Sequence, residues 1–242
     1  MVKFLLTLVT SLLLSFQVKA IEVNLAVGPD HKEMMAHDYP LYAASWNFLH
    51  IVLREQGHTL IAHPMPWARA KDQVLKGNLD GLFLSANLKG RDQWAELTMP
   101  LGYDYFGLFK NDITKVSNTV GVVRIGQHDQ IHSSLQDKKL IEVATAHVGL
   151  QLLMTNKVDG FAMSEGYGKF LLGTYFKKAN HQISFDYKDA ERRSAHIAVS
   201  KFHSDRDLVL NLLNNAIKYG KAQGYYQTIM ADYGVDELHQ AN

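Results

Sequence analysis

The sequence contains no cysteine. This absence excludes disulfide bonds, thiol chemistry and a lipid anchor on an N-terminal cysteine. Beyond residue 20 no stretch is long and apolar enough to span a bilayer. The stability of the fold must therefore come from burial, which a content of 47% hydrophobic residues makes feasible.

Signatures of well-known catalytic sites are also missing. The sequence has no Gly-x-Ser-x-Gly, no phosphate-binding loop and no dinucleotide-binding fingerprint. Twelve histidines are present, with His58 and His63 five apart and His128 and His132 four apart, but no His-Glu-x-x-His helix occurs. No acidic residue stands at ligand spacing beside these pairs, so we expect no metal site and no cofactor.

Charge of one sign is not in excess. The chain carries 25 basic and 24 acidic residues, and removal of the first 20 residues takes away Lys3 and Lys19, leaving 23 basic residues and a formal charge of −1. A basic face is therefore not implied, and we expect no nucleic-acid partner.

The first 20 residues have the pattern of a secretory signal peptide. Lys3 gives a positive start, residues 4–16 form an apolar run broken only by Thr and Ser, and Val18-Lys19-Ala20 places small residues at the third-last and last positions. We expect cleavage after Ala20. A membrane anchor is the alternative, but the run is shorter than the roughly 20 residues of a spanning helix. An exported chain without cysteine or anchor fits the bacterial periplasm.

The rest of the chain alternates apolar segments of strand and helix type. Strands are expected at 21–29, 58–63, 80–85, 105–109, 118–126, 141–146, 158–164 and 194–201. Helices are expected at 40–57, 66–77, 147–156 and 225–233. A further helix is expected from residue 204 onward, with Ser204 and Asp207 as caps and with interruptions at Gly220 and Gly224. Such alternation predicts a mostly parallel sheet with crossover helices and ligands beyond the carboxyl ends of the strands.

Two junctions along the chain look alike. Asp80-Gly81 opens the strand "DGLFLS" and Asp159-Gly160 opens the strand "DGFAMS", each after a helix and a turn. We interpret them as corresponding points of two related lobes. Chance similarity of two short motifs is the alternative.

The order of these motifs resembles the family 3 periplasmic solute-binding proteins, which have the type 2 binding-protein fold of amino-acid ABC importers. "LKGNLDGLFLSANLKGRDQWAELTMPLGYDYFGLF" resembles the first-lobe signature, and "NTVGVVRIGQ" resembles the start of the second lobe. "LLMTNKVDGFAMSEGYG" resembles the second lobe's ligand-side strand, and "AHIAVSKFHSDRDLVLNLLNNAIKYGKAQGYYQTIMADYG" resembles the closing segment. The resemblance covers nearly all of residues 21–235.

This resemblance implies an α/β fold with two lobes. Residues 21–109 together with 200–242 would form lobe 1, and residues 110–199 would form lobe 2. Two crossings, near 109–115 and 192–200, would act as hinges, and a ligand would bind in the cleft between the lobes.

The resemblance also points to Arg91 as the residue that grips a ligand carboxylate, a task for which guanidinium geometry is suited. Ser85 and Asn87 would add hydrogen bonds to the same group. The alternative for Arg91 is a solvated arginine at the start of a helix. The alternative for Ser85 and Asn87 is that they only form the turn. The loop before Arg91 is one residue shorter than in typical amino-acid binders.

Aromatic and basic residues on other segments are further candidates. Trp67 and Arg69 lie in the first turn of a helix whose N-terminus should face the cleft, so Trp67 could stack on the ligand and Arg69 could contact an acidic group. Core packing is the alternative for Trp67. Tyr103 and Tyr105 either line the cleft or pack the hinge.

In amino-acid binders, an aspartate of the second lobe binds the ligand ammonium. The resemblance places Ser164 at this position, with Glu165 next to it. Glu165 is our candidate for that task and Tyr167 for assisting it, and a solvated loop glutamate is the alternative. Arg124 and Gln127 are weaker candidates. These departures from the family pattern put a standard α-amino acid ligand in doubt.

Three functions follow from these observations. The leading one is a monomeric periplasmic binding protein that captures a small polar, carboxylate-bearing, amino-acid-like solute for a membrane ABC permease or a sensor receptor. The second is an enzyme like the cyclohexadienyl dehydratases on the same fold, with Glu165 as proton donor. The third is a structural protein whose cleft binds nothing.

Overall fold

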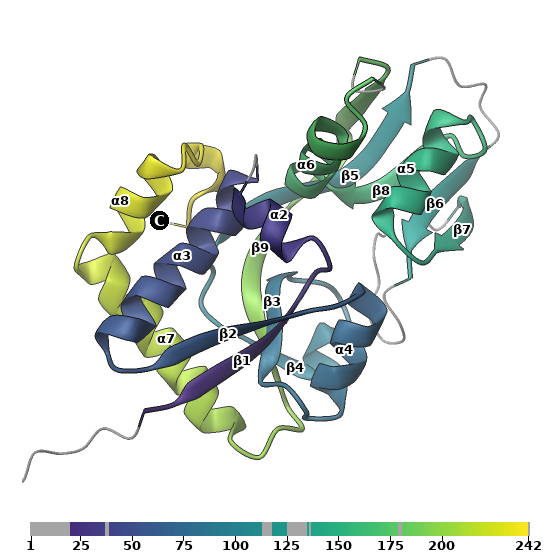
Figure 1. Ribbon diagram of the computed structural model, residues 1–242. Helices are drawn as coiled ribbons and strands as arrows, with labels where there is room; N and C mark the ends of the chain where they lie inside the picture. Colours follow the sequence, from purple (N-terminus) through teal and green to yellow (C-terminus); the bar gives the residue numbers. More distant parts are fainter. Residues whose placement is uncertain are drawn as a thin grey trace, which may run out of the picture.

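The computed structural model describes residues 20–36, 39–112, 118–124, 135, 137–178 and 181–241. These residues form two α/β lobes connected by long strands (Figure 1). The expected signal peptide lies outside the described residues except for Ala20, and Gln127, His128 and His132 lie outside them as well. Within the described part of the chain, every helix is too short or too polar to cross a bilayer.

Lobe 1 is built around parallel strands that the apolar pattern predicts. The strand β1 (Glu22–Val27) pairs in parallel with β2 (Thr59–Pro64) and with β3 (Gly81–Ala86). The helix α4 lies on one side of these strands, and α3, α7 and α8 lie on the other (Figure 1). The helices of this lobe are α2 (His31–Ala36), α3 (Pro40–Glu55), α4 (Trp67–Leu75), α7 (Arg206–Ala222) and α8 (Tyr225–Asp232).

Lobe 2 repeats the arrangement on a smaller scale. The strand β6 (Thr119–Val123) pairs in parallel with β7 (Lys139–Val143) and with β8 (Gly160–Ser164). The helices α5 (Ala146–Met154) and α6 (Glu165–Tyr175) belong to this lobe. The apolar patterns predict its strands and α5, but not α6.

The two lobes are joined by β5 (Gly102–Asn111) and β9 (Ile183–Ser200). These strands pair with each other in antiparallel fashion along nearly the whole length of β5, with a shift of register between Phe106 and Leu108. The sheet order is β2-β1-β3-β9-β5-β8-β6-β7, and the short β4 (Ala95–Leu97) also pairs with β9. The lobe boundaries that we placed at residues 109 and 200 stay a prediction, because both strands run through the junction.

The expectation of a mostly parallel sheet is therefore correct only within each lobe. The strand β9 adds antiparallel partners to β3, β4 and β5, and β5 adds one to β8. We expected the last strand to begin at Ser194, but it begins at Ile183, because its polar first half is held by backbone pairing with β5 rather than by apolar burial.

The helix α6 is absent from the prediction because it carries three glycines, which disfavour a helix interior. A Cβ atom on Gly168 would overlap the ring of Phe109, and one on Gly166 would overlap the ring of Tyr39. These glycines therefore serve close packing of α6 against neighbouring side chains. Glu165, which we considered as a solvated loop residue, is the buried first residue of this helix.

Two details of α7 also differ from the prediction. The helix does not stop at Gly220 but continues to Ala222, because the missing side chain lets α7 lie directly against α3. Its N-cap is Asp205 rather than Ser204 or Asp207, and the Asp205 side chain makes no capping hydrogen bond.

The two Asp-Gly junctions occupy matching places in the two lobes. The Asp80 carboxylate accepts a hydrogen bond from the Asn24 N–H of β1 at 2.6 Å, and the Asp159 carboxylate accepts one from the Thr119 N–H of β6 at 2.8 Å. The backbone N–H of each aspartate donates to the carbonyl of the same partner residue. The shared motif thus ties each lobe's third strand to its first.

The close approach of α7 to α3 leads to a test of stability. A Cβ atom on Gly220 would overlap the edge of the fully buried Phe48 ring and lie 2.7 Å from Cγ2 of Val52. We predict that Gly220→Ala lowers the free energy of unfolding by about 1–3 kcal/mol through overpacking. Gly173→Ala on α6 is the control: no atom lies within 4 Å of its Cβ, so it should stabilise by up to about 1 kcal/mol. Urea denaturation measures both, and equal effects would contradict the packing argument.

Candidate functional site

A cavity of about 170 Å³ lies between the two lobes. Its wall combines residues of β3, α4 and the segments around α2 from lobe 1, residues of β6, β8, α5 and α6 from lobe 2, and residues of β5 and β9. The lining residues are Met34, Tyr39, Tyr42, Trp67, Lys71, Leu82, Leu84, Ser85, Ala86, Leu88, Arg91, Asp104, Phe106, Val123, Ala146, Ala162, Met163, Ser164, Tyr167, Arg193, Ser194 and Ala195.

Arg91 lines this cavity, and its side chain is fixed by lobe 1. It opens the short 3₁₀ turn η2 (Arg91–Gln93), after Gly90 in a left-handed conformation with φ of 88°. Its Nη1 donates hydrogen bonds to Ser85 Oγ and to the Ala86 carbonyl. The residue is 6% exposed, so it is not the solvated helix-start arginine of the alternative interpretation.

Ser85 reaches the cavity through an irregular stretch of β3. The pairing of β3 with β9 shifts register between Leu82 and Ser85, and Leu84 adopts φ of 45°, which is unusual for a leucine. Both Leu84 and Ser85 line the cavity. Backbone strain of this kind concentrates at binding sites, so the bulge is part of the site rather than a fault in the sheet.

Two further basic residues, which the sequence did not suggest as candidates, line the cavity. Lys71 follows Trp67 by four residues on α4, is 3% exposed, and its Nζ lies 5.2 Å from the centroid of the Trp94 ring. The Arg91 Cζ lies 5.5 Å from the same ring. Arg193 on β9 is held by Glu191, with Nη2 2.6 Å from the carboxylate, and lies over the Phe106 ring.

The predicted candidates divide into two groups. Ser85, Arg91, Trp67 and Tyr167 come together in the cavity wall, which leaves Trp67 half-buried at the cleft rather than in the core. Four others lie outside this wall. They are Asn87, Arg69, Tyr103 and Glu165. Asn87 and Arg69 are exposed, and the Tyr103 ring centroid lies 3.7 Å from the Arg192 guanidinium carbon.

The remaining candidates also lie away from the cavity. Tyr105 makes edge contacts with Tyr187 and His239, so it packs near the junction of the lobes. Arg124 is exposed and lies near Glu142, with Nε to Oε2 at 3.3 Å. Gln127 is outside the described residues.

Glu165 is buried but is directed to other partners. Its Oε1 accepts hydrogen bonds from Lys169 Nζ and from Tyr187 Oη. Ser164, immediately before it, lines the cavity instead. The place that carries an acid in the family pattern is therefore a serine of the cavity wall. A contact of Glu165 with a ligand ammonium stays a prediction.

Asp104 on β5 is a carboxylate of the cavity wall that sequence patterns gave no reason to select. Its Oδ2 accepts a hydrogen bond from Tyr39 Oη at 3.0 Å, and its Oδ1 accepts from the N–H groups of Tyr105 at 2.8 Å and Gly166 at 3.3 Å. Burial raises the pKa of Asp104 to about 6, although the hydrogen bonds from Tyr39 and Gly166 and the nearby His239 act in the opposite direction.

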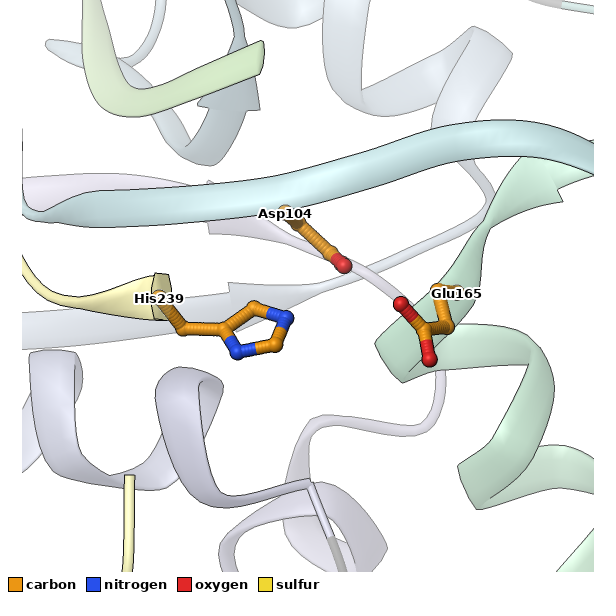
Figure 2. A group of neighbouring side chains, drawn as sticks. All are labelled: Asp104, Glu165 and His239. Carbon is orange, nitrogen blue, oxygen red and sulfur yellow. The ribbon is translucent and has the colours of Figure 1, made fainter. Parts of the chain in front are cut away.

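Asp104 also belongs to a cluster with Glu165 and His239, whose ligand-type atoms lie within 4.8 Å of one another. Figure 2 shows the three side chains converging from β5, from the start of α6 and from the C-terminal segment. Carboxylate and imidazole groups are suitable metal ligands. Asp104 and Glu165 also accept hydrogen bonds from groups of the protein itself, among them the Lys169 ammonium at Glu165.

The lobes also contact each other directly beside the cavity. The Asp30 carboxylate, which precedes α2 in lobe 1, accepts a hydrogen bond from Tyr167 Oη of α6 at 2.5 Å. His147 Nε2 of α5 lies 4.0 Å from the same carboxylate. Tyr39 and Tyr167 stack across the junction with ring centroids 6.5 Å apart. These contacts hold the two lobes together on one side of the cleft.

The environment of Asp104 predicts a pH dependence of stability. Between its ordinary pKa of 3.8 and about 6, the folded protein keeps a proton on Asp104 that the unfolded chain has lost. The contribution of Asp104 to the free energy of unfolding therefore falls as the pH rises through this window. Asp104→Asn cannot titrate, so the stability advantage of the wild type over this variant should be larger at pH 4 than at pH 7.

Urea denaturation at pH 4, 5, 6 and 7 measures this difference. Asp92→Asn, which changes an exposed aspartate of the same lobe, should keep the pH dependence of the wild type. A constant difference between the wild type and Asp104→Asn would contradict the raised pKa.

No model of a known protein family matches the sequence, and no curated protein matches it. Solved structures do match. The substrate-binding protein of an amino acid ABC transporter has a TM-score of 0.65 and 14% identity, over 88% of this chain and 98% of that one. An arginine third transport system periplasmic binding protein from Legionella pneumophila has a TM-score of 0.65 and 14% identity, over 87% and 99%.

A histidine kinase sensor domain with similarity to periplasmic binding proteins has a TM-score of 0.67 and 17% identity, over 87% of this chain and 95% of that one. Many of the similar structures are substrate-binding proteins of amino-acid ABC transporters. The architecture, the cleft and these likenesses agree: the chain has the type 2 periplasmic binding protein fold, with two α/β lobes around a ligand-sized cavity.

Proposed function

We propose that this protein is an exported, monomeric solute-binding protein of the periplasm that captures a small carboxylate-bearing solute between its lobes. The observation that carries the proposal is the buried Arg91 in the cavity wall, oriented by Ser85 and by the Ala86 carbonyl. A guanidinium held in one orientation can donate two parallel hydrogen bonds to a carboxylate. Ser85, Trp67 and Tyr167 complete the proposed contact surface.

The proposed cycle is one of capture and presentation. A solute enters between the open lobes, the lobes close about the junction formed by β5 and β9, and the closed form docks on a membrane partner. That partner is an ABC permease or a sensor receptor. Both kinds of partner are consistent with the similar structures, which include transporter-binding proteins and a kinase sensor domain.

A dehydratase-like enzyme on the same fold is the alternative function. Such an enzyme would need a proton donor directed into the cleft. Glu165, the residue considered for this task, is bonded to Lys169 and Tyr187 and does not belong to the cavity wall. The place of Glu165 therefore removes the support that the sequence gave to this alternative.

A thermal-shift screen of the mature protein tests the proposal. The panel contains amino acids, organic acids, polyamines and nucleosides, and a solute that binds only the folded form must raise the melting temperature. We expect a shift with carboxylates and none with polyamines or nucleosides. The absence of any shift across the panel would contradict a binding function.

Arg91→Lys tests the anchor itself. The variant keeps the positive charge but loses the planar fork, so we expect affinity for the best solute to fall at least tenfold, on the order of 1.4 kcal/mol. Arg69→Lys, the same exchange at an exposed position of lobe 1, is the matched control and should bind like the wild type. Isothermal titration calorimetry measures both, and unchanged affinity in Arg91→Lys would reject Arg91 as the anchor.

A further inference from the structure

We infer that Asp104 on β5 is the acid that pairs with an ammonium group of the solute, while Arg91 takes the carboxylate of the same molecule. The inference rests on the proposed function and adds a second anchor to it. This anchor lies on a strand that joins the lobes, and not at the second-lobe position where amino-acid binders carry their acid. The solute is then a small zwitterion.

Asp104 is the acid of the cavity wall. Among the described residues that line the cavity, it is the one that carries a carboxylate. Its side chain is held from both lobes: Tyr39 Oη donates to Oδ2 from lobe 1, and the Gly166 N–H donates to Oδ1 from the start of α6 in lobe 2. The carboxylate is therefore fixed in one orientation at the surface that faces the solute.

The hydrogen-bond donors around Asp104 are neutral. They are the hydroxyls of Tyr39 and Ser164 and the N–H groups of Tyr105 and Gly166. Neutral donors solvate a carboxylate but do not balance its charge. An ammonium from the solute would supply that balance with a charge-assisted hydrogen bond, which is stronger than a neutral one.

Charged side chains close to Asp104 have ion pairs of their own. Glu165, which belongs to the same cluster, is paired with Lys169. Arg193, which lies opposite Asp104 in the pairing of β5 with β9, is paired with Glu191. The His239 imidazole is the third member of the cluster and favours the ionised form of Asp104. Asp104 therefore differs from Glu165 in that neutral groups, and not an ammonium of the protein, donate to it.

The burial of Asp104 increases what a cation can contribute. Burial raises the pKa of this carboxyl to about 6, which shows that its ionised form is less well solvated than in water. A cation placed next to a desolvated carboxylate restores part of this lost stabilisation, and the attraction is stronger than at the protein surface. A solute without a cation would cover the same carboxylate and offer it no partner.

Aromatic rings surround the proposed ammonium position. Tyr39, whose hydroxyl is bonded to Asp104, stacks with Tyr42 at a centroid distance of 5.6 Å and with Tyr167 at 6.5 Å. All three rings belong to residues of the cavity wall. Aromatic rings attract organic ammonium groups through their π electrons. The surroundings of Asp104 therefore suit an ammonium that is carried on an organic solute.

The topology explains how Asp104 can replace the acid of the family pattern. That acid corresponds to Ser164, the last residue of β8, which carries no charge. The strand β5 pairs with β8, and Phe106 lies opposite Ser164. Asp104 is two residues from Phe106 along β5, and the Ser164 hydroxyl forms a hydrogen bond with it. The negative charge is thus displaced by one strand but stays next to the same place in the cavity.

Paired solutes that differ only in an amino group test the inference on the wild-type mature protein. The pairs are L-alanine with propionate, L-valine with isovalerate, L-glutamine with 4-carbamoylbutanoate, and L-phenylalanine with 3-phenylpropionate, each titrated calorimetrically. We expect at least one amino acid to bind at least about tenfold more tightly than its amine-free partner, because only the amino acid can pair with Asp104. Equal or tighter binding of the amine-free acid in every pair in which binding is detected would overturn the inference while leaving a solute-binding function intact.

Asp104→Asn assigns the preference to this side chain. The variant keeps the shape but removes the charge, so the preferred amino acid should bind at least about tenfold more weakly, while its amine-free partner changes by less than about threefold. An equal loss for both members of the pair would indicate a structural role alone and would contradict the inference. Asp92→Asn, the same exchange at an exposed position of lobe 1, is the matched control and should bind like the wild type. The wild-type comparison decides the matter if Asp104→Asn does not fold.

Glu165→Gln separates the inference from its closest rival. If Glu165 met the ammonium, the preference for the amino acid would disappear in Glu165→Gln and persist in Asp104→Asn, and this result would overturn the inference. We expect the opposite outcome, since Glu165 lies outside the cavity wall. If none of these solutes binds, the inference fails, and the proposed function fails with it only if the broader solute screen is also negative.

Discussion

The pairing of β5 with β9 is the interaction on which the rest of the structure depends. These two strands belong to both lobes, and their hydrogen bonds run from Gly102 opposite Ala195 to Asn111 opposite Ile183. The register of this pairing shifts between Phe106 and Leu108. Asp104 and Arg193, which face each other across this pair, both line the cavity. The same strands thus join the lobes and contribute charged groups to the site.

Around this junction the charges are distributed unequally. The lobe 1 side presents the buried Lys71 and Arg91, which lie beside Trp94, whereas the lobe 2 side presents four apolar residues and the hydroxyl-bearing Ser164 and Tyr167. The two lobes therefore offer different chemistry to the cavity, with basic side chains on the lobe 1 side and mostly hydrocarbon on the lobe 2 side.

Much of this could be predicted from the sequence, for reasons that individual elements make clear. Alternating apolar residues predict β1, short apolar runs predict β3 and β8, and the motif around Ser85 and Arg91 predicts two residues of the cavity wall. Lys71 could not be recognised, because a lysine in a helix is normally solvated. Asp104 and Arg193 become neighbours only through pairing of strands that are distant in sequence. The helix α6 could not be predicted because its glycines lower the local helix propensity. Their role in close packing depends on neighbouring elements and is seen only in the folded structure.

The contact between Asp30 and Tyr167 has a consequence for the balance between open and shut conformations. This hydrogen bond links the lobes through the chain's own side chains and involves no atom of a solute. It lowers the free energy of the shut conformation in the empty and loaded protein alike, so the population of shut molecules depends less steeply on occupancy. In the proposed cycle, a membrane partner that sensed only the distance between the lobes would then not distinguish the empty protein from the loaded one. Discrimination must rely on surface features that change when the cavity itself is filled.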